Sequence, residues 1–227
     1  MSAIKRLVRV NFHKILLITC GLAILLIILY QVVGITKDLG KVKAIYQLLI
    51  PTIFYSFVGI ANALFNTLVQ PYTNIIDLVR FTKRENWLKV VFGWNIVTSL
   101  WSALVSSLVL EVTLICNPAI TKIYWSTLLL TILVAFENLL FIQSLILLVY
   151  LLVRWLNYFF VNCLGYLMVM ILANIQINNR AIFNFLNSKF LLSGEMKELL
   201  LQSLIMWGII ILCQNISLFL YERKENL

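Results

Sequence analysis

The feature that most constrains this chain is a series of long apolar runs separated by short polar segments. Apolar residues make up 62% of its 227 residues, and charged residues make up 12%. A soluble domain of this length cannot hide so much apolar surface in one core, whereas lipid solvates it directly. The sequence therefore predicts an all-α integral membrane protein with a single transmembrane domain.

The apolar runs predict six transmembrane helices, because about 20 apolar residues in a helix cross the hydrocarbon core of a bilayer. The expected spans are residues 15–33, 44–69, 90–115, 123–153, 155–175 and 199–220. The boundary at Arg154 between spans four and five requires a tight reversal, since one continuous rod would far exceed the bilayer thickness. Residues 2–14 predict a basic amphipathic helix at the membrane surface. Residues 178–197 mix aromatic and polar side chains, as short helices at the outer interface do.

The positive charges indicate how the chain is oriented in the membrane. Six spans place both termini on one side, and most of the 18 lysines and arginines lie on that side. By the positive-inside rule, both termini are expected in the cytoplasm. The net charge of +9 is thus explained by topology. Nucleic-acid binding is not indicated, because the basic residues do not gather on one groove-like face.

The densest interior group of charges lies in residues 70–89, which read QPYTNIIDLVRFTKRENWLK. Asn74 is a candidate helix N-cap, and Asp77 follows near the positive end of that helix. The helix would gather Asp77, Arg80 and Arg84 on the side opposite its isoleucines. Two interpretations are open. The segment is either an ordinary cytoplasmic loop whose charges only set the topology, or a surface helix that docks on a soluble partner.

A few polar residues interrupt the predicted spans. Asn62 and Asn66 are four residues apart and therefore share a helix face, which should look toward other helices or a cavity. A carboxyl near mid-membrane costs a few kcal/mol, so Glu137 should face protein or water. It is either protonated, bonded within the bundle or part of a substrate route. Asn157 and Asn162 give span five an interior face, and these five residues are the candidates for a substrate path.

Span three carries a stripe of small polar residues at helical spacing. Its members are Asn95, Ser99, Ser102 and Ser106. Such stripes favour close packing between membrane helices, and they also line some transport pathways. Both interpretations stay open, and the packing seam is favoured.

Recognisable catalytic chemistry is missing from the sequence. It has no phosphate-binding glycine loop, no metal-ligand helix and no nucleophile elbow. Its one histidine, His13, has no catalytic or metal partner nearby, and its four cysteines lack metal-ligand spacing. The chain is therefore not expected to be an enzyme or to bind a metal or cofactor itself, and active transport would need an ATPase on another chain.

The order of the predicted elements resembles that of the type-2 permeases of ABC exporters. The shared features are a basic amphipathic leader, six spans, a charged cytoplasmic helix between spans two and three, and short outer helices before span six. The stretch IIDLVRFTKRENWLKVVFGWN is similar to the segment of small bacterial members in which a basic and aromatic cluster precedes span three.

This resemblance implies an ATPase subunit as partner, which would bind ATP and Mg²⁺, and a second permease in a homodimer or heterodimer. It implies that the charged helix is a coupling helix seated in a cleft of the ATPase. The residues it assigns to that contact are Asp77, Arg80, Lys83, Arg84 and Glu85. It further implies a bacterial cytoplasmic membrane and the export of a peptide or other amphipathic substrate, as in bacteriocin or lantibiotic export and immunity.

Two other classes of function are open. The chain is alternatively a membrane immunity or assembly protein that binds a partner without transport. It is alternatively a secondary transporter in which Glu111 or Glu137 handles protons. Charge reversal at Arg80 and Arg84 tests ATPase coupling, and Glu137→Gln tests proton coupling.

Overall fold

The computed structural model describes residues 8–9, 11–32, 58–67, 85–115, 125–153, 158–174, 176–177, 180–181 and 196–223. The elements in these ranges are α2 (Phe12–Val32), α4 (Gly59–Thr67), α6 (Glu85–Ile115), α7 (Trp125–Leu152), α8 (Tyr158–Asn174), β1 (Gln176–Ile177), β2 (Arg180–Ala181) and α10 (Met196–Arg223). Apart from one short antiparallel hairpin, β1–β2, the described chain is helical, as predicted.

Three of these helices are long and apolar enough to cross a membrane. The segments are Leu88–Val109 in α6, Ile132–Leu152 in α7 and Ser203–Tyr221 in α10. Shorter apolar helical segments are Phe12–Ile28 in α2 and Tyr158–Val169 in α8. The chain is therefore a helical, multi-pass membrane protein.

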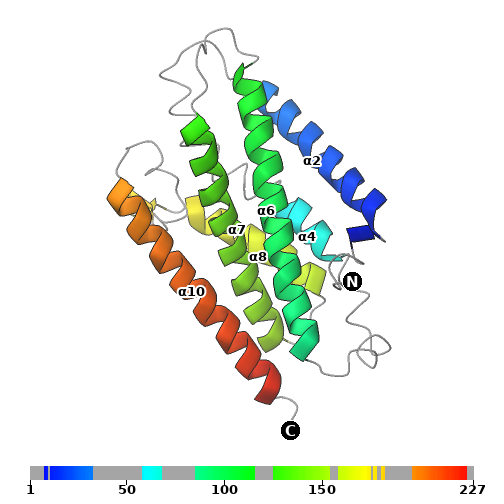
Figure 1. Ribbon diagram of the computed structural model, residues 1–227, viewed down its shortest axis with the longest axis vertical. Coiled ribbons are helices and arrows are strands. Elements are labelled where there is room, and N and C mark those ends of the chain that lie inside the picture. The colour runs from blue at the N-terminus through cyan, green and yellow to red at the C-terminus, as the bar shows by residue number, and fades with distance from the viewer. Residues whose placement is uncertain are drawn as a thin grey trace.

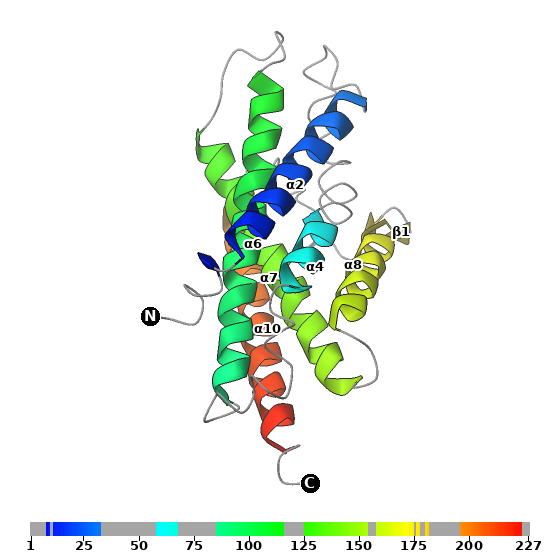
Figure 2. The ribbon, with the colours of Figure 1, turned by 90° about the vertical axis from the view of Figure 1, so that its right-hand side faces the viewer.

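The helices form a bundle with α6 and α7 at its centre (Figure 1). Helix α10 packs along α7, and α2 packs along α6 on the opposite side (Figure 1). The shorter helices α4 and α8 lie side by side and cover a third side (Figure 2). The start of α6 and the ends of α7 and α10 lie at the same end of the bundle, so α6 and α7 are antiparallel (Figure 1).

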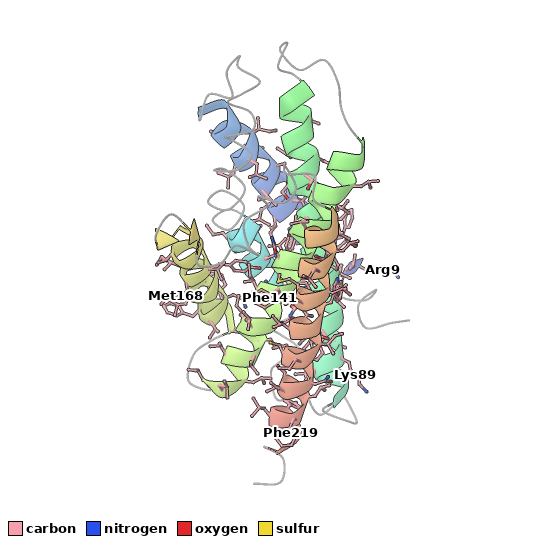
Figure 3. All side chains as sticks on the ribbon, turned by 90° about the vertical axis from the view of Figure 1, so that its left-hand side faces the viewer. Arg9, Lys89, Phe141, Met168 and Phe219 are labelled. Atoms are coloured by element: carbon pink, nitrogen blue, oxygen red, sulfur yellow. The ribbon has the colours of Figure 1, made fainter. Side chains whose placement is uncertain are left out.

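Helix α7 is the most buried of the three long apolar helices. In its apolar segment 61% of the residues are buried, against 22% in α10. The core around α7 contains Leu139, Leu140, Ile142, Leu147, Trp94 and Phe65. Outward-facing side chains are also apolar, as Met168 on α8 and Phe219 on α10 illustrate (Figure 3). A helix that is apolar on all sides suits a bundle with lipid around it.

Two glycines allow helices to approach closely. A Cβ at Gly59 on α4 would lie 2.6 Å from Cδ1 of Tyr166 on α8. A Cβ at Gly165 on α8 would lie 2.5 Å from Cγ1 of Ile146 on α7. Both separations are too short for any side chain, so glycine at these positions lets α8 sit directly against α4 and α7.

The described helices overlap the predicted spans. Spans one, three, four and six correspond to α2, α6, α7 and α10. The predicted break near Arg154 is confirmed, because α7 ends at Leu152 and α8 begins at Tyr158. Helix α6 starts already at Glu85, so the helix takes in residues that were expected to precede span three.

Other parts of the prediction fall largely outside the described residues. Only α4 represents span two, and only Val8 and Arg9 represent the amphipathic leader before residue 11; both are helical. The segment expected to hold short outer helices includes Arg180–Ala181, which forms β2 and pairs with β1 instead. Residues 178–179 and 182–195 lie outside the described residues.

Candidate functional site

A network of uncharged polar side chains lies in the core where α4, α6, α7 and α8 meet. Its members are Asn62 and Asn66 of α4, Ser102 of α6, Gln143 of α7, and Asn162 and Tyr166 of α8. All six residues are buried, and none is more than 3% exposed. We call this set the polar network.

The hydroxyl of Tyr166 is the point at which three helices converge. Its oxygen accepts a hydrogen bond from Nδ2 of Asn62 at 3.1 Å and another from Nε2 of Gln143 at 2.7 Å. Ser102 Oγ donates to Oδ1 of the same Asn62 at 2.7 Å, which adds α6. One phenol oxygen thus satisfies two buried amide donors at once.

The side chain of Asn66 joins the same helices one turn further along α4. Its Nδ2 donates to Oε1 of Gln143 at 2.8 Å and to Oδ1 of Asn162 at 3.0 Å. Asn162 Nδ2 in turn donates to the backbone carbonyl of Tyr158 at 2.9 Å. The two bonds of Asn66 cross between helices, whereas the bond of Asn162 to the Tyr158 carbonyl lies within α8. All are buried, and an unpaired amide is costly in such a setting.

The sequence spacing explains why these residues meet. Asn62 and Asn66 are one helical turn apart, as are Asn162 and Tyr166, so each pair shares one helix face. Gly59 precedes the first pair and lies against the ring of Tyr166, which brings the two faces within hydrogen-bonding distance. Close by, Trp94 Nε1 of α6 donates to the backbone carbonyl of Phe65 at 3.1 Å.

Five buried polar atoms lack a hydrogen-bond partner within the described part of the chain. They are Oδ1 of Asn66, Oδ1 of Asn95, Oγ of Ser99, Oγ of Ser107 and Oη of Tyr158. Buried polar atoms are normally paired, so such a group indicates strain or a site for another molecule. Of these five residues only Asn66 belongs to the polar network, so the network contains one buried oxygen without a partner among the described residues.

The carboxyl of Glu137 belongs to a different contact. It is 5% exposed and lies at the interface of α7 with α10. Its Oε1 accepts hydrogen bonds from Ser203 Oγ and from Trp207 Nε1, the latter at 2.8 Å. The ring of Trp207 also packs against Phe136 on α7. Glu137 was expected to face protein or water, and it faces protein, since the bundle supplies two donors to its carboxyl.

The structure brings together three of the five predicted substrate-path residues. Asn62, Asn66 and Asn162 are members of the polar network, whereas Glu137 contacts α10 instead. Asn157 lies outside the described residues. The whole stripe of α6 is buried, in agreement with a packing seam. Ser102 donates to Asn62 of α4, whereas Ser106 donates to the Ser102 backbone carbonyl of its own helix.

The predicted coupling residues are mostly outside the described ranges. Asp77, Arg80, Lys83 and Arg84 fall between α4 and α6, in a part that is not described. Glu85 is the first residue of α6.

Two central members of the polar network, Gln143 and Tyr166, were not among the predicted site residues. Gln143 is one of the polar residues within the apolar run of span four. Tyr166 had a usable signal in the sequence, because it follows Asn162 by one helical turn and Tyr158 precedes Asn162 by one turn. A polar or aromatic-hydroxyl residue at every fourth position marks an inward face in a membrane helix.

The described residues contain no group of three or more His, Cys, Asp or Glu side chains that would hold a metal ion. No model of a protein family matches the chain, and neither does any curated protein or solved structure.

Proposed function

We propose that the chain is the membrane-spanning permease subunit of an ATP-driven exporter, with ATP and Mg²⁺ bound by a separate ATPase subunit. The proposed substrate is a peptide or another amphipathic molecule, moved out of a bacterial cytoplasmic membrane. The proposal rests on the resemblance in element order and on one observation in the bundle. The two helices that flank the charged segment are bonded to each other in the core.

That observation concerns α4 and α6. Residues 68–84 connect the end of α4 to the start of α6. The two helices are joined by the bond from Ser102 to Asn62 and by the bond from Trp94 to the Phe65 carbonyl. A force applied to residues 68–84 therefore acts on both helices, and through Asn62 and Asn66 it reaches α7 and α8.

In this proposal, Asp77, Arg80, Lys83, Arg84 and Glu85 contact the ATPase. Closure of the ATPase moves α4 relative to α6 and breaks the bonds between them. Their breakage exposes uncharged amide and hydroxyl groups between the helices. Such groups suit an amphipathic peptide that enters from the bilayer, because they bind peptide groups without fixing a charge in the membrane. A second permease subunit completes the path.

The test is purification of the tagged chain from its native membrane in mild detergent, with identification of the proteins that accompany it. Wild type is compared with Arg80→Glu and with the matched control Lys122→Glu, a reversal on the side expected to be external. We expect an ATPase subunit with wild type and with the control, and its loss with Arg80→Glu. Retention by Arg80→Glu would refute the coupling assignment. Absence of an ATPase from all three samples would refute the exporter and favour a binding protein without transport.

A second candidate function is proton-coupled secondary transport, and the buried carboxyl of Glu137 is the observation that favours it. A carboxyl inside a membrane bundle is a common proton carrier in transporters. Glu137→Gln keeps acceptor oxygen for Ser203 and Trp207 but removes the titrating group. Transport with an unchanged pH profile in this variant would exclude a proton route through Glu137.

A further inference from the structure

Helix α10 presents an amide side chain on the surface of the bundle. Asn215 is exposed, although it lies in Ser203–Tyr221, one of the three segments long and apolar enough to cross a membrane. The amide side chains in the other two segments are all buried, and they belong to Asn95, Asn138 and Gln143. The amide of Asn215 makes no hydrogen bond to any other residue in the described part of the chain. Asn215 therefore brings an unpaired polar group to the lipid-facing surface.

Asn215 points away from the helix that α10 packs along. The buried side of α10, which packs along α7, consists of Met206, Ile210, Cys213 and Ser217. A helix turns by about 100° per residue, so Gly208 and Asn215 lie on the opposite side, two turns apart. Leu201 and Leu212 share that side and are 61% and 57% exposed. We call Leu201, Gly208, Leu212 and Asn215 the outer face of α10, a helix at the edge of the bundle (Figure 1).

Gly208 leaves room for a close approach in the middle of the outer face. A Cβ at this position would meet nothing within 4 Å. At Gly59 and Gly165, in contrast, the missing Cβ makes space for another helix of the same chain. Small residues are enriched in membrane helices where two helix backbones come close together. Gly208 thus offers a close contact to a helix from outside this bundle.

The chemistry of the outer face selects its partner. Lipid tails offer no hydrogen bond to Asn215, whereas amides on neighbouring membrane helices bond to each other. A carboxamide is both donor and acceptor, so the Asn215 side chains of two copies satisfy one another. Copies of one chain insert with the same orientation, so a two-fold axis along the membrane normal makes their α10 helices parallel and sets each residue opposite itself. Contacts seven residues apart suit such a parallel pair, in which one asparagine fixes the register.

We infer that two copies of this chain form a homodimer through the outer face of α10. Gly208 lies where the two helices are closest, and the two Asn215 amides hydrogen-bond to each other at the two-fold axis. The inference goes beyond the proposed export and does not rest on it, because association through α10 requires neither an ATPase nor a substrate.

The experiment measures association of the purified full chain in lipid vesicles. Its four cysteines are replaced by alanine, and a donor or an acceptor dye is attached to a cysteine added at the C-terminus. Energy transfer between labelled copies is recorded while the protein is diluted with lipid, which gives the dimerisation constant. We expect transfer that saturates at the level of a dimer. Transfer no greater than that of randomly mixed monomers at every dilution would overturn the inference.

Two substitutions test the outer face without touching the core. Asn215→Leu removes the amide and should lower the dimerisation constant about threefold to twentyfold for each hydrogen bond lost. Gly208→Leu keeps the helices apart and should weaken the dimer at least as much, since leucine itself is a good helix former. Gly21→Leu on α2 is the matched control, because a Cβ there also meets nothing within 4 Å, and it should dimerise like wild type. Circular dichroism should show the same helical content in all variants. Unchanged dimerisation of both α10 variants would refute the assignment.

Disulfide crosslinking places the interface on one helix. Leu212→Cys on α10 and Met168→Cys on α8 are compared in the cysteine-free chain, at positions that are 57% and 56% exposed. The two helices lie on different parts of the bundle, as the labelled Met168 and Phe219 indicate (Figure 3). With copper phenanthroline as oxidant in native membranes, we expect a covalent dimer from Leu212→Cys and little from Met168→Cys. Equal crosslinking at both positions, or crosslinking at Met168→Cys alone, would place the contact elsewhere and refute the inference.

Discussion

Removal of a hydroxyl group from Tyr166 and from Tyr158 should change stability in opposite directions. Both tyrosines are on α8 and both are buried, at 3% and 6% exposure. Tyr166 Oη accepts hydrogen bonds from Asn62 and Gln143, whereas Tyr158 Oη has no partner in the described part of the structure. Replacement by phenylalanine is the same chemical change at both sites, so the difference isolates the bonds.

The magnitude for Tyr166→Phe follows from the two amide donors that lose their acceptor. Hydrogen bonds between membrane helices contribute about 0.6 kcal/mol on average and up to about 1.7 kcal/mol. Donors left unpaired in a core cost about 1–3 kcal/mol each. Two such donors give a loss of about 2 kcal/mol, or roughly 4–8 °C in melting temperature for a chain of this size. The second bond of Gln143, through Oε1 to Asn66, is unaffected and limits the loss.

Tyr158→Phe removes an unpaired polar atom from a low-dielectric interior. We expect a stability between that of wild type and about 1 kcal/mol above it. Both variants are measured by thermal unfolding in detergent. Tyr150→Phe, at a half-buried tyrosine on α7, is the control for loss of a phenol. If Tyr166→Phe and Tyr158→Phe shift the melting temperature equally, the described hydrogen bonds do not hold the four helices together.

Three further changes test other contacts by the same unfolding measurement. Gly59→Ala places a methyl group 2.6 Å from the ring of Tyr166 and should cost about 1–3 kcal/mol, whereas Gly208→Ala meets nothing within 4 Å and should be neutral or stabilising. Equal effects would show that α4 and α8 are not in tight contact. Glu137→Leu leaves two donors of α10 unpaired and should be less stable than Glu137→Gln by about 1–3 kcal/mol; a Gln variant as unstable as Leu would refute the bonded carboxyl. Trp101→Phe breaks one exposed bond to α2, and its expected cost of about 0.6 kcal/mol should be clearly below that of Tyr166→Phe.

The sequence predicted those features that depend on the residues of one helix alone. Apolar length is a property of one segment, so α6, α7 and α10 were found, and so was the break between α7 and α8. The inward faces were also predictable, because Asn62 and Asn66 stand out against apolar neighbours at a helical spacing. Each of these signals requires only local periodicity and the cost of a polar group in lipid.

The helix that each buried polar side chain bonds to was not predictable in the same way. Gln143 and Glu137 lie on the same helix and are both polar, yet one bonds to α4 and α8 and the other to α10. The direction in which each faces depends on how α7 is rotated against its neighbours. That rotation is set by packing over several helices, including the close approach of Gly165 to Ile146. A sequence read one segment at a time does not contain this information.

The contact between Glu137 and α10 has a consequence for how the chain is made. Ribosomes synthesise α7 before α10, so Glu137 enters the bilayer before Ser203 and Trp207 exist as donors. Helix α10 then packs chiefly along α7, and its arrival pairs the carboxyl. A nascent chain in which α10 has not yet been inserted therefore keeps an unpaired carboxyl within the membrane.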